Sequence, residues 1–482
     1  MADNKPAPQA FKKLNKKEIK ALGEKLLRQP KTVWEQADAQ TRAAIFALAE
    51  EYKTFMDQAK TERRAVAAIR AAAEKAGFKP LGSKAKGGRF YAELAGKTIA
   101  LLVLGQRPVA QGVRLIGSHI DAPRLDLKMH PLFENQDLAF LKTHYYGGIK
   151  KYQWFARPLA IVGVVCTADG RTVEINLGDA PDDPVFTVLD LLPHLSRKGQ
   201  EGKKLSEVFE AERMNLVIAG LPLDGEGNGD RIKLAAMQLL NQRYGIVEAD
   251  LISAELEIVP AGNARDVGLD RALVGAYGQD DRASAFASLR AILDLKNPVA
   301  PALAVFYDKE EIGSEGMSGA QSRWIEHLVA AMLTANQEPT DYLTISRALA
   351  ASKVLSADVN AALDPDYPEV HEKNNAARLG YGVTLTKYTG HGGKYGASDA
   401  NAEFVAWLRG VWEKAGVTWQ AAGMGKIDEG GGGTIAKFLA AYGADVVDVG
   451  PALLSMHSPF EIMHKADLWS SVQAYQAFFA AK

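Results

Sequence analysis

From Arg282 onward, apolar helical segments alternate with short strands, and this alternation constrains the fold more than any other feature. The predicted order is helix 283–295, strand 303–307, helix 319–334, strand 353–356, helices 399–415 and 434–442, and strand 445–449. Regular alternation of strands and helices implies a parallel sheet whose two faces are covered by helices. We therefore predict an α/β fold with a mostly parallel sheet flanked by helices.

The first quarter of the chain adds further elements to this unit, namely helical periodicity over 16–27 and 34–76 and strands at 98–104 and 113–118. Between about residues 125 and 265 the pattern changes. Short alternating runs lie there among Gly, Pro and Asp turn signals. We predict a discontinuous domain made of residues 1–124 and 266–482, interrupted by an inserted β-rich domain of residues 125–265.

Composition excludes several classes of protein. The 482 residues include 57 basic and 58 acidic side chains, and this net charge of -1 argues against bulk binding to nucleic acid or an anionic membrane. Cys166 is the only cysteine, so an intrachain disulfide and a thiolate zinc site are both excluded. No apolar run approaches the ~20 residues of a membrane span, and the first residues are polar. We expect a cytoplasmic enzyme.

Histidine and carboxylate residues cluster where predicted strands end. These residues are His119 and Asp121 in RLIGSHIDAPR, Asp308, Glu310 and Glu311 in LAVFYDKEEIGSEG, Asp358 in KVLSADVN, and His457 and Glu461 in ADVVDVGPALLSMHSPFE. Ligands of open parallel sheets bind beyond the carboxyl ends of the strands. Two histidines and several carboxylates without thiolate suit zinc, manganese or cobalt. The pattern predicts a metal site at this edge of the sheet.

The spacing within these segments suggests separate tasks. Asp121 lies two residues after His119, on the same strand face, where it can accept the second N–H of a metal-bound imidazole. Of the neighbours Glu310 and Glu311, one can bind metal while the other acts as general base. Asp280-Asp281 opens a helix, where a carboxylate can bridge two cations. Two such ions activate a water molecule and polarise a carbonyl group.

Each of these features also has a simpler structural explanation. A His-x-Asp pair is commonly a hydrogen-bonded pair, and Glu-Glu is commonly a solvated helix face. Asp280-Asp281 can cap a helix, and Asp358 can be a turn residue. Gly430–Gly433 can form either a flexible loop or a surface of backbone N–H groups for a substrate. The common placement of the acids and histidines at element ends of one sheet favours the metal site.

Seven segments spread over about residues 85–475 resemble one known family, the aspartyl and vacuolar aminopeptidases, which are dinuclear zinc exopeptidases. The segments are SHIDAPRLDLK, PHL, DDRASAF, DKEEIGSEG, SADVNAALDP, GGKYGASDAN and MHSPFE. This resemblance implies a bacterial-type member that holds two divalent ions, with zinc expected and manganese or cobalt open. The implied metal ligands are His119, Asp281, Glu311, Asp358 and His457.

The resemblance also implies individual roles. Asp281 would bridge the two ions, and the peptide bond after it would be cis. Glu310 would be the general base, and Asp121 would orient His119. His194 would reach the active site of a neighbouring subunit, and Lys394 would lie near the substrate. The implied fold is of the zinc exopeptidase type with an inserted dimerisation domain, and the implied assembly is a tetrahedral dodecamer of dimers.

The predicted function is therefore a dinuclear metal-dependent aminopeptidase that acts on peptides with a free N-terminus. The Asp-Asp-Arg of residues 280–282 is shared with glutamyl and tetrahedral aminopeptidases, where the eukaryotic aspartyl enzymes have Asp-Asn, so a strict preference for acidic residues does not carry over. Two alternatives keep the scaffold, namely a glutamyl or tetrahedral type of aminopeptidase and an N-acyl amidase. A third is a metal-dependent structural shell without activity.

Overall fold

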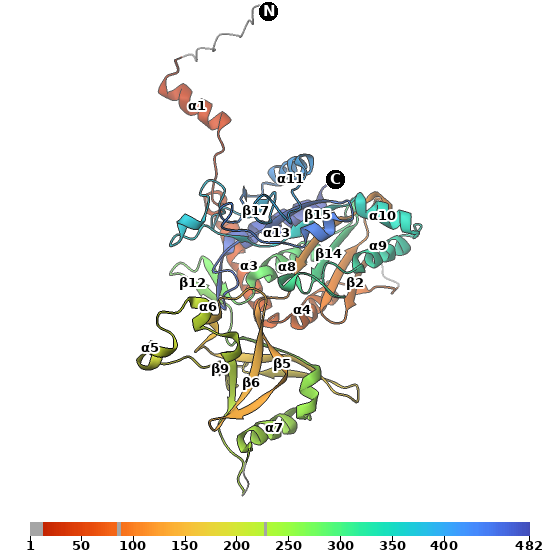
Figure 1. The fold of residues 1–482 in the computed structure, drawn as a ribbon. Helices are drawn as coiled ribbons and strands as arrows, with labels where there is room; N and C mark the ends of the chain where they lie inside the picture. The colour runs from red at the N-terminus through yellow and green to blue at the C-terminus, as the bar shows by residue number, and fades with distance from the viewer. Residues whose placement is uncertain (1–12, 84–87, 226–228) are drawn as a thin grey trace, which may run out of the picture.

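A nine-stranded sheet forms the centre of the protein (Figure 1). The computed structural model describes residues 13–83, 88–225 and 229–482. In spatial order the strands are β1 (Lys79–Pro80), β2 (Arg89–Leu94), β3 (Thr98–Val103), β14 (Ala302–Tyr307), β4 (Arg114–His119), β15 (Lys353–Ala357), β19 (Asp445–Gly450), β17 (Val383–Thr386) and β18 (Trp419–Ala421). The four central strands, from β14 to β19, run parallel, while β3 and β17 run antiparallel to the strand on their inner side. The predicted α/β fold is confirmed.

Helices cover both faces of this sheet, as its continuous apolar strands require, since every residue of β3, β4 and β14 is buried. One face packs against α3 (Ala39–Gln58), α4 (Glu62–Lys75), α8 (Gln279–Leu293), α11 (Ala402–Ala415) and α13 (Lys465–Ala480). The other face packs against α9 (Trp324–Ala335), α10 (Tyr342–Ala350) and α12 (Ala436–Ala440). No helix among the described residues is both long and apolar enough to span a bilayer.

The helical stretch predicted as 34–76 is broken into α2 (Val33–Gln36), α3 and α4. Side chains that cap helix N-termini mark the breaks, because Asp38 accepts the Thr41 N–H at 2.8 Å and Thr61 accepts the Arg64 N–H at 3.3 Å. The preceding helix, α1 (Lys16–Leu26), has no buried residue and projects away from the body in Figure 1.

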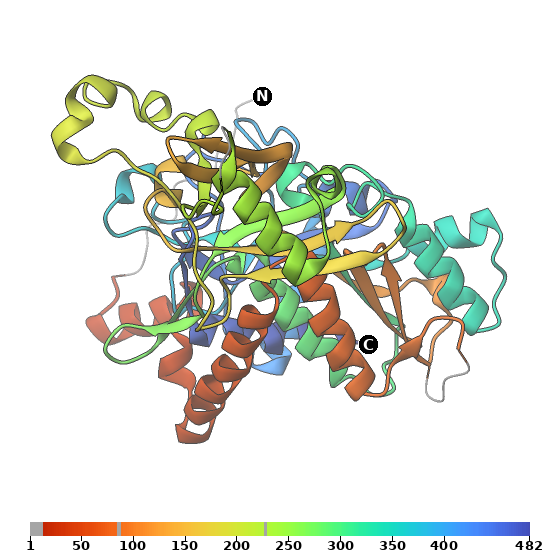
Figure 2. The same cartoon turned by 90° about the horizontal axis from the view of Figure 1, so that it is seen from below.

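A second, antiparallel sheet extends below the main unit in Figure 1 and has its own apolar core. Its strands in spatial order are β8 (Thr172–Leu177), β7 (Leu159–Cys166), β11 (Ala254–Pro260), β5 (Arg124–Asn135), β6 (Leu138–Tyr146), β10 (Asn215–Ala219) and β9 (Thr187–Val188). Helix α7 (Arg231–Tyr244) lies across this sheet in the view from below (Figure 2). We refer to this sheet and its connections as the inserted unit; its predicted role in dimerisation stays a prediction.

A small third sheet, which the sequence analysis did not predict, lies next to the ends of the central strands. It consists of β12 (Arg265–Val267), β13 (Leu273–Ala276), β21 (Glu461–His464), β20 (Ala452–Leu454) and β16 (Asn360–Ala361). Because β13 runs into the start of α8 and β20 connects to β21 through His457, this sheet positions two chain segments that carry candidate ligands.

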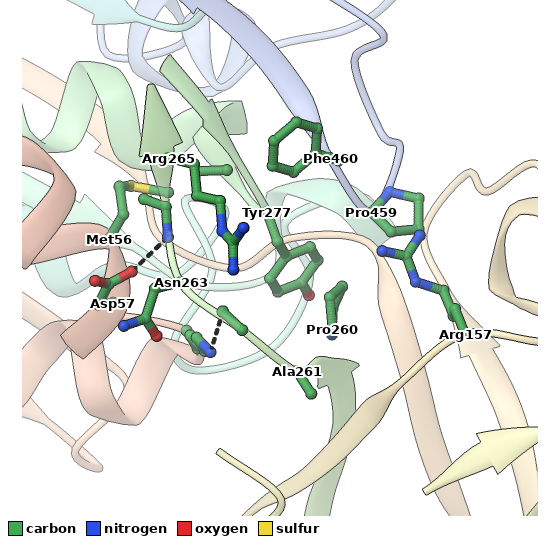
Figure 3. A pocket seen from close by; sticks show the side chains of 14 residues that line it. Met56, Asp57, Arg157, Pro260, Ala261, Asn263, Arg265, Tyr277, Pro459 and Phe460 are labelled. Carbon is green, nitrogen blue, oxygen red and sulfur yellow. Dashed lines mark hydrogen bonds between the residues drawn. The ribbon is translucent and has the colours of Figure 1, made fainter. Parts of the chain in front are cut away.

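The chain returns from the inserted unit to the main unit through residues 260–265, beside a cavity of about 180 Å³ (Figure 3). Asp57 accepts the Ala264 N–H at 2.7 Å, and Lys60 donates to the Gly262 carbonyl oxygen at 2.7 Å. Tyr277 and Phe460 line the same cavity. These contacts hold the return segment against the end of α3.

We expect Leu355→Ala to lower the free energy of unfolding by about 2–5 kcal/mol, because Leu355 is fully buried on the central strand β15 and its removal leaves a cavity. Leu343→Ala is the matched control, since Leu343 is 54% exposed on α10, and its effect should stay within about 0.5 kcal/mol. Chemical denaturation followed by circular dichroism measures both. Equal losses for the two variants would contradict the proposed core.

Candidate metal centre

The carboxyl ends of the central strands converge on one cleft of about 350 Å³. His119 is the last residue of β4, Glu310 and Glu311 lie in the 3-10 turn that follows β14, and Asp358 follows β15. The cleft is lined by His119, Asp280, Glu310, Glu311, Asp358 and His457. The residues predicted from strand ends therefore meet in one cleft with Asp280 from the start of a helix, although His119 and His457 are 338 positions apart along the chain.

The Asp280 carboxylate lies between the two histidines. Its Oδ1 is 3.2 Å from His119 Nε2, and its Oδ2 is 3.1 Å from His457 Nε2. The Asp281 carboxylate is directed at the backbone of His119 instead, since its Oδ2 accepts the His119 backbone N–H at 3.3 Å. Its carboxylate also groups with His119 and Asp358, with ligand atoms within 4.8 Å of one another.

The cis peptide bond joins Asp280 to Asp281, so the prediction that it follows Asp281 is wrong by one residue. Neither residue is helical, since Asp280 has ψ 109° and Asp281 has φ -113° and ψ 27°. The regular helix therefore starts after this pair. The two neighbouring carboxylates reach different partners.

Two buried carboxylate oxygens of the centre have no hydrogen-bond donor among the described residues. Asp281 Oδ1 and Glu311 Oε1 are buried and accept no hydrogen bond from any residue that the structure describes. Burial raises the pKa of Asp281, of Glu311 and of Asp358 well above the ordinary range, and neighbouring carboxylates raise each further. Buried carboxylates without donors either take up a proton or pair with a cation. Imidazole nitrogen and carboxylate oxygen form a donor set that fits zinc and other divalent ions.

Asp121 holds two parts of the centre together. Its Oδ1 is 3.3 Å and its backbone oxygen 3.1 Å from His119 Nδ1. Its carboxylate also accepts the backbone N–H groups of Glu310 at 3.1 Å and of Glu311 at 3.2 Å. The carboxylate predicted to orient His119 therefore also fixes the turn that carries both glutamates.

Glu310 faces the cleft with an unusually basic carboxylate. Burial, together with the charges of Asp121 and Asp280, raises the pKa of Glu310 to about 7. A carboxylate with a pKa near the working pH is suited to exchange protons with a reacting water molecule. The position of Glu310 in the cleft and its raised pKa are therefore compatible with the predicted general base.

Two groups that the sequence analysis did not assign support His457. Glu461 accepts the backbone N–H groups of His457 at 2.7 Å, of Gln279 at 2.5 Å and of Asp280 at 3.2 Å. The Gly148 carbonyl oxygen accepts from His457 Nδ1 at 2.8 Å. The strand-end position of Glu461 was a signal in the sequence, whereas Gly148 belongs to the inserted unit and had none.

Two predicted residues lie outside the group of acids and histidines. His194 is exposed in the 3-10 turn Pro193–Leu195 of the inserted unit and does not line the cleft of its own chain. Lys394 lines an extension of the cleft that shares Asp358, and its Nζ lies 3.0 Å from Asp399. Gly431–Gly433 also line the cleft, which favours contact with a substrate over a free loop.

Comparison with known proteins identifies the class to which this α/β protein belongs. The model of the M18 family, described as aminopeptidase I zinc metalloprotease, matches residues 55–479. The chain belongs to this family, and it is therefore a zinc metallopeptidase of the aminopeptidase type, which confirms the resemblance seen in the sequence.

Individual relatives support the assignment to this family. The chain is 47% identical over 450 residues to a probable M18 family aminopeptidase 1 of Thermotoga maritima, covering 93% of this chain and 98% of the relative. The crystal structure of an M18 aminopeptidase from Thermotoga maritima matches with a TM-score of 0.90 at 46% identity, over 94% of this chain and 99% of that one. A Saccharomyces cerevisiae mApe1 dodecamer matches with a TM-score of 0.72 at 23% identity, over 90% and 96% of the two chains, and this likeness shows the fold alone.

We expect Glu461→Ala to destabilise the protein and to lower its peptidase activity. The substitution removes the acceptor of two buried backbone N–H groups, at a cost of about 1–3 kcal/mol for each, and of the partly buried His457 N–H. Glu461→Gln keeps one acceptor oxygen and should lie between the wild type and Glu461→Ala. Denaturation and kcat measure both effects, and a fully stable and active Glu461→Ala variant would show that this carboxylate holds nothing in place.

Proposed function

We propose that this protein is a dinuclear metal-dependent aminopeptidase that removes N-terminal residues from peptides, with Glu310 as general base. The single observation that carries the proposal is the Asp280 carboxylate, which has one oxygen directed at each of two histidines. Two imidazoles that share one carboxylate, with further carboxylates beside each, support a site for two cations rather than one.

We propose a ligand set that differs at one position from the set implied by the resemblance. His119 and Asp358 would hold one ion and Glu311 and His457 the other, with Asp280 rather than Asp281 as the bridging carboxylate. The distances from Asp280 to both histidines support this exchange. Zinc is the ion named for the family, and manganese or cobalt remain chemically suitable.

The residues of the chain would divide the chemistry between them. When bound, two divalent cations lower the pKa of water and polarise the peptide carbonyl group. Glu310 takes a proton from the attacking water and delivers it to the leaving amine, a role worth about 10²–10⁴ in rate. Asp121 keeps Glu310 in reach of the cleft through the backbone of the 3-10 turn. Carboxylates around the centre would bind the free α-ammonium group and so restrict cleavage to N-termini.

The substrate would enter along the cleft and its extension of about 570 Å³, where Lys394 would contact it.

An N-acyl amidase on the same scaffold would prefer blocked substrates, so matched free and N-acetylated peptides separate the two functions. A glutamyl or tetrahedral type of aminopeptidase would differ in the N-terminal residue it prefers. The cytoplasmic location stays a prediction from the sequence.

We also propose that the protein self-associates through the inserted unit into dimers and that these form a tetrahedral dodecamer. The dodecamer described for the yeast relative supports an assembly of this kind. The exposed position of His194 supports its predicted role in the active site of a neighbouring subunit, where it would donate a hydrogen bond to the developing oxyanion.

We expect Glu310→Gln to keep its metal and to lose about 10²–10⁴ in kcat, because the amide cannot accept the proton. Glu311→Ala should instead lose metal, because it removes a ligand. Glu315→Gln, an exposed neighbour, is the control and should behave as the wild type. Elemental analysis beside kcat measures all three. Metal loss in Glu310→Gln with retention in Glu311→Ala would reverse the two roles.

Substitution of the two neighbouring aspartates separates the candidates for the bridge. Asp280→Asn should lose metal at both positions, because it weakens the shared ligand, whereas Asp281→Asn should retain more metal. Metal stoichiometry measured by titration under chelator competition gives the comparison. Greater loss in Asp281→Asn would restore Asp281 as the bridging residue.

We expect His194→Ala to lower kcat about 10²–10³-fold while metal content and assembly stay intact, because a donor to the oxyanion is lost. His130→Ala, another exposed histidine of the inserted unit, is the control. Mixed subunits of His194→Ala and Glu310→Gln should regain activity, since one subunit supplies the histidine and the other the base. Absence of recovery after subunit exchange would remove His194 from the neighbouring site.

A further inference from the structure

The end of strand β6 in the inserted unit reaches the metal centre of the main unit. Tyr146, the last residue of β6, donates its hydroxyl hydrogen to Asp121 Oδ2 at 2.9 Å. Two residues later, the Gly148 carbonyl oxygen accepts from His457 Nδ1 at 2.8 Å. Residues 146–148 therefore contact His457 itself and Asp121, the carboxylate beside His119.

Tyr146 is itself held in place from within the inserted unit. It pairs with Arg124 across β5 and β6, and the Arg124 guanidinium lies 3.9 Å from the centroid of the Tyr146 ring. Arg124 in turn forms ion pairs with Asp126 at 2.8 Å and with Glu257 at 3.1 Å. Because Tyr146 is buried and stacked in this way, the direction of its hydroxyl group is set by the sheet.

The bond from Tyr146 acts on the group that places the glutamates. Asp121 Oδ2 accepts from both the Tyr146 hydroxyl and the Glu311 backbone N–H, while Oδ1 accepts from the Glu310 backbone N–H. Loss of the hydroxyl would leave one donor on Oδ2 and allow the carboxylate to rotate. Rotation would move the 3-10 turn that carries Glu310.

Gly147 lies between these two contacts, and its missing side chain leaves room for Glu311, a candidate ligand. Its φ is +69°, and a Cβ atom there would lie 3.3 Å from Glu311 Cβ and 3.4 Å from Glu311 Oε2. A larger residue would therefore press on Glu311 as well as strain the backbone.

We infer that Tyr146 is a positioning residue for the peptidase reaction, which acts through Asp121 on His119 and Glu310. With Gly148, it makes the inserted unit part of the catalytic centre in the same chain, in addition to any role in assembly. The inference rests on the proposed functions of Asp121 and Glu310.

The test compares Tyr146→Phe with Tyr145→Phe in the intact zinc-loaded protein. Both substitutions remove one hydroxyl group from β6, but Tyr145 is 42% exposed. At saturating zinc, Tyr146→Phe should lower kcat about 10–100-fold, with KM within about twofold and the melting temperature unchanged. Its zinc affinity in chelator competition should fall about 10-fold. Tyr145→Phe should match the wild type in every measurement.

Two results would overturn the inference. One is a Tyr146→Phe variant with wild-type kcat and zinc affinity, and the other is a loss of activity that only follows a lower melting temperature. A wild-type protein without peptidase activity would refute the proposed function instead. A zinc affinity lowered by Tyr146→Phe and not by Tyr145→Phe would still support positioning of the centre in that case.

A glycine pair gives a second, independent comparison. Gly147→Ala should weaken zinc binding by about 10-fold or more, because the new methyl group meets Glu311. Gly170→Ala is the matched control, since Gly170 also has a positive φ, of +89°, at a turn of the inserted unit, but a Cβ atom added there would have no neighbouring atom within 4 Å. Equal zinc affinities in the two variants would contradict contact between residues 146–148 and the metal centre.

Discussion

A group of buried carboxyl side chains around one cleft is the constraint on which the rest of the structure depends. Asp280, Asp281, Glu311 and Asp358 lie close together with two histidines, and burial raises the pKa of Asp281, of Glu311 and of Asp358. Such a group is unfavourable as long as its charges are not neutralised by protons or cations. The protein keeps it in place with two further carboxylates that bind backbone N–H groups, Asp121 for the turn after β14 and Glu461 for the loop of His457.

The sheet explains why these residues can meet. Parallel central strands end at one edge, so side chains from β4, β14 and β15 arrive there from distant parts of the sequence. The small sheet of β13, β20 and β21 then positions the start of α8 and the loop of His457. The inserted unit contributes through Tyr146 and Gly148, which contact Asp121 and His457. Two units of different architecture therefore share the support of one centre.

Much of the fold and of the centre could be predicted, for identifiable reasons. Apolar strands that end at His119 or shortly before Glu310 and Asp358 indicate both the sheet and the site in their local pattern. The breaks between α2, α3 and α4 were missed, although Asp38 and Thr61 are recognisable capping residues. The short strands of the third sheet carry little local signal, since strands of two to four residues such as β16 and β21 are too short to show a period.

The sequence alone determined the α/β class, the chemical identity of the donor set and the strand ends that supply it, because these follow from local periodicity and from residue type. Tertiary structure decided which of two adjacent aspartates faces both histidines. Dihedral angles at Asp280 and Asp281 separate the two carboxylates, and no spacing rule distinguishes neighbours of the same type. The tertiary structure also decided that Tyr146 and Gly148 of the inserted unit reach the metal centre. Such contacts depend on how two sheets pack, which local sequence does not encode.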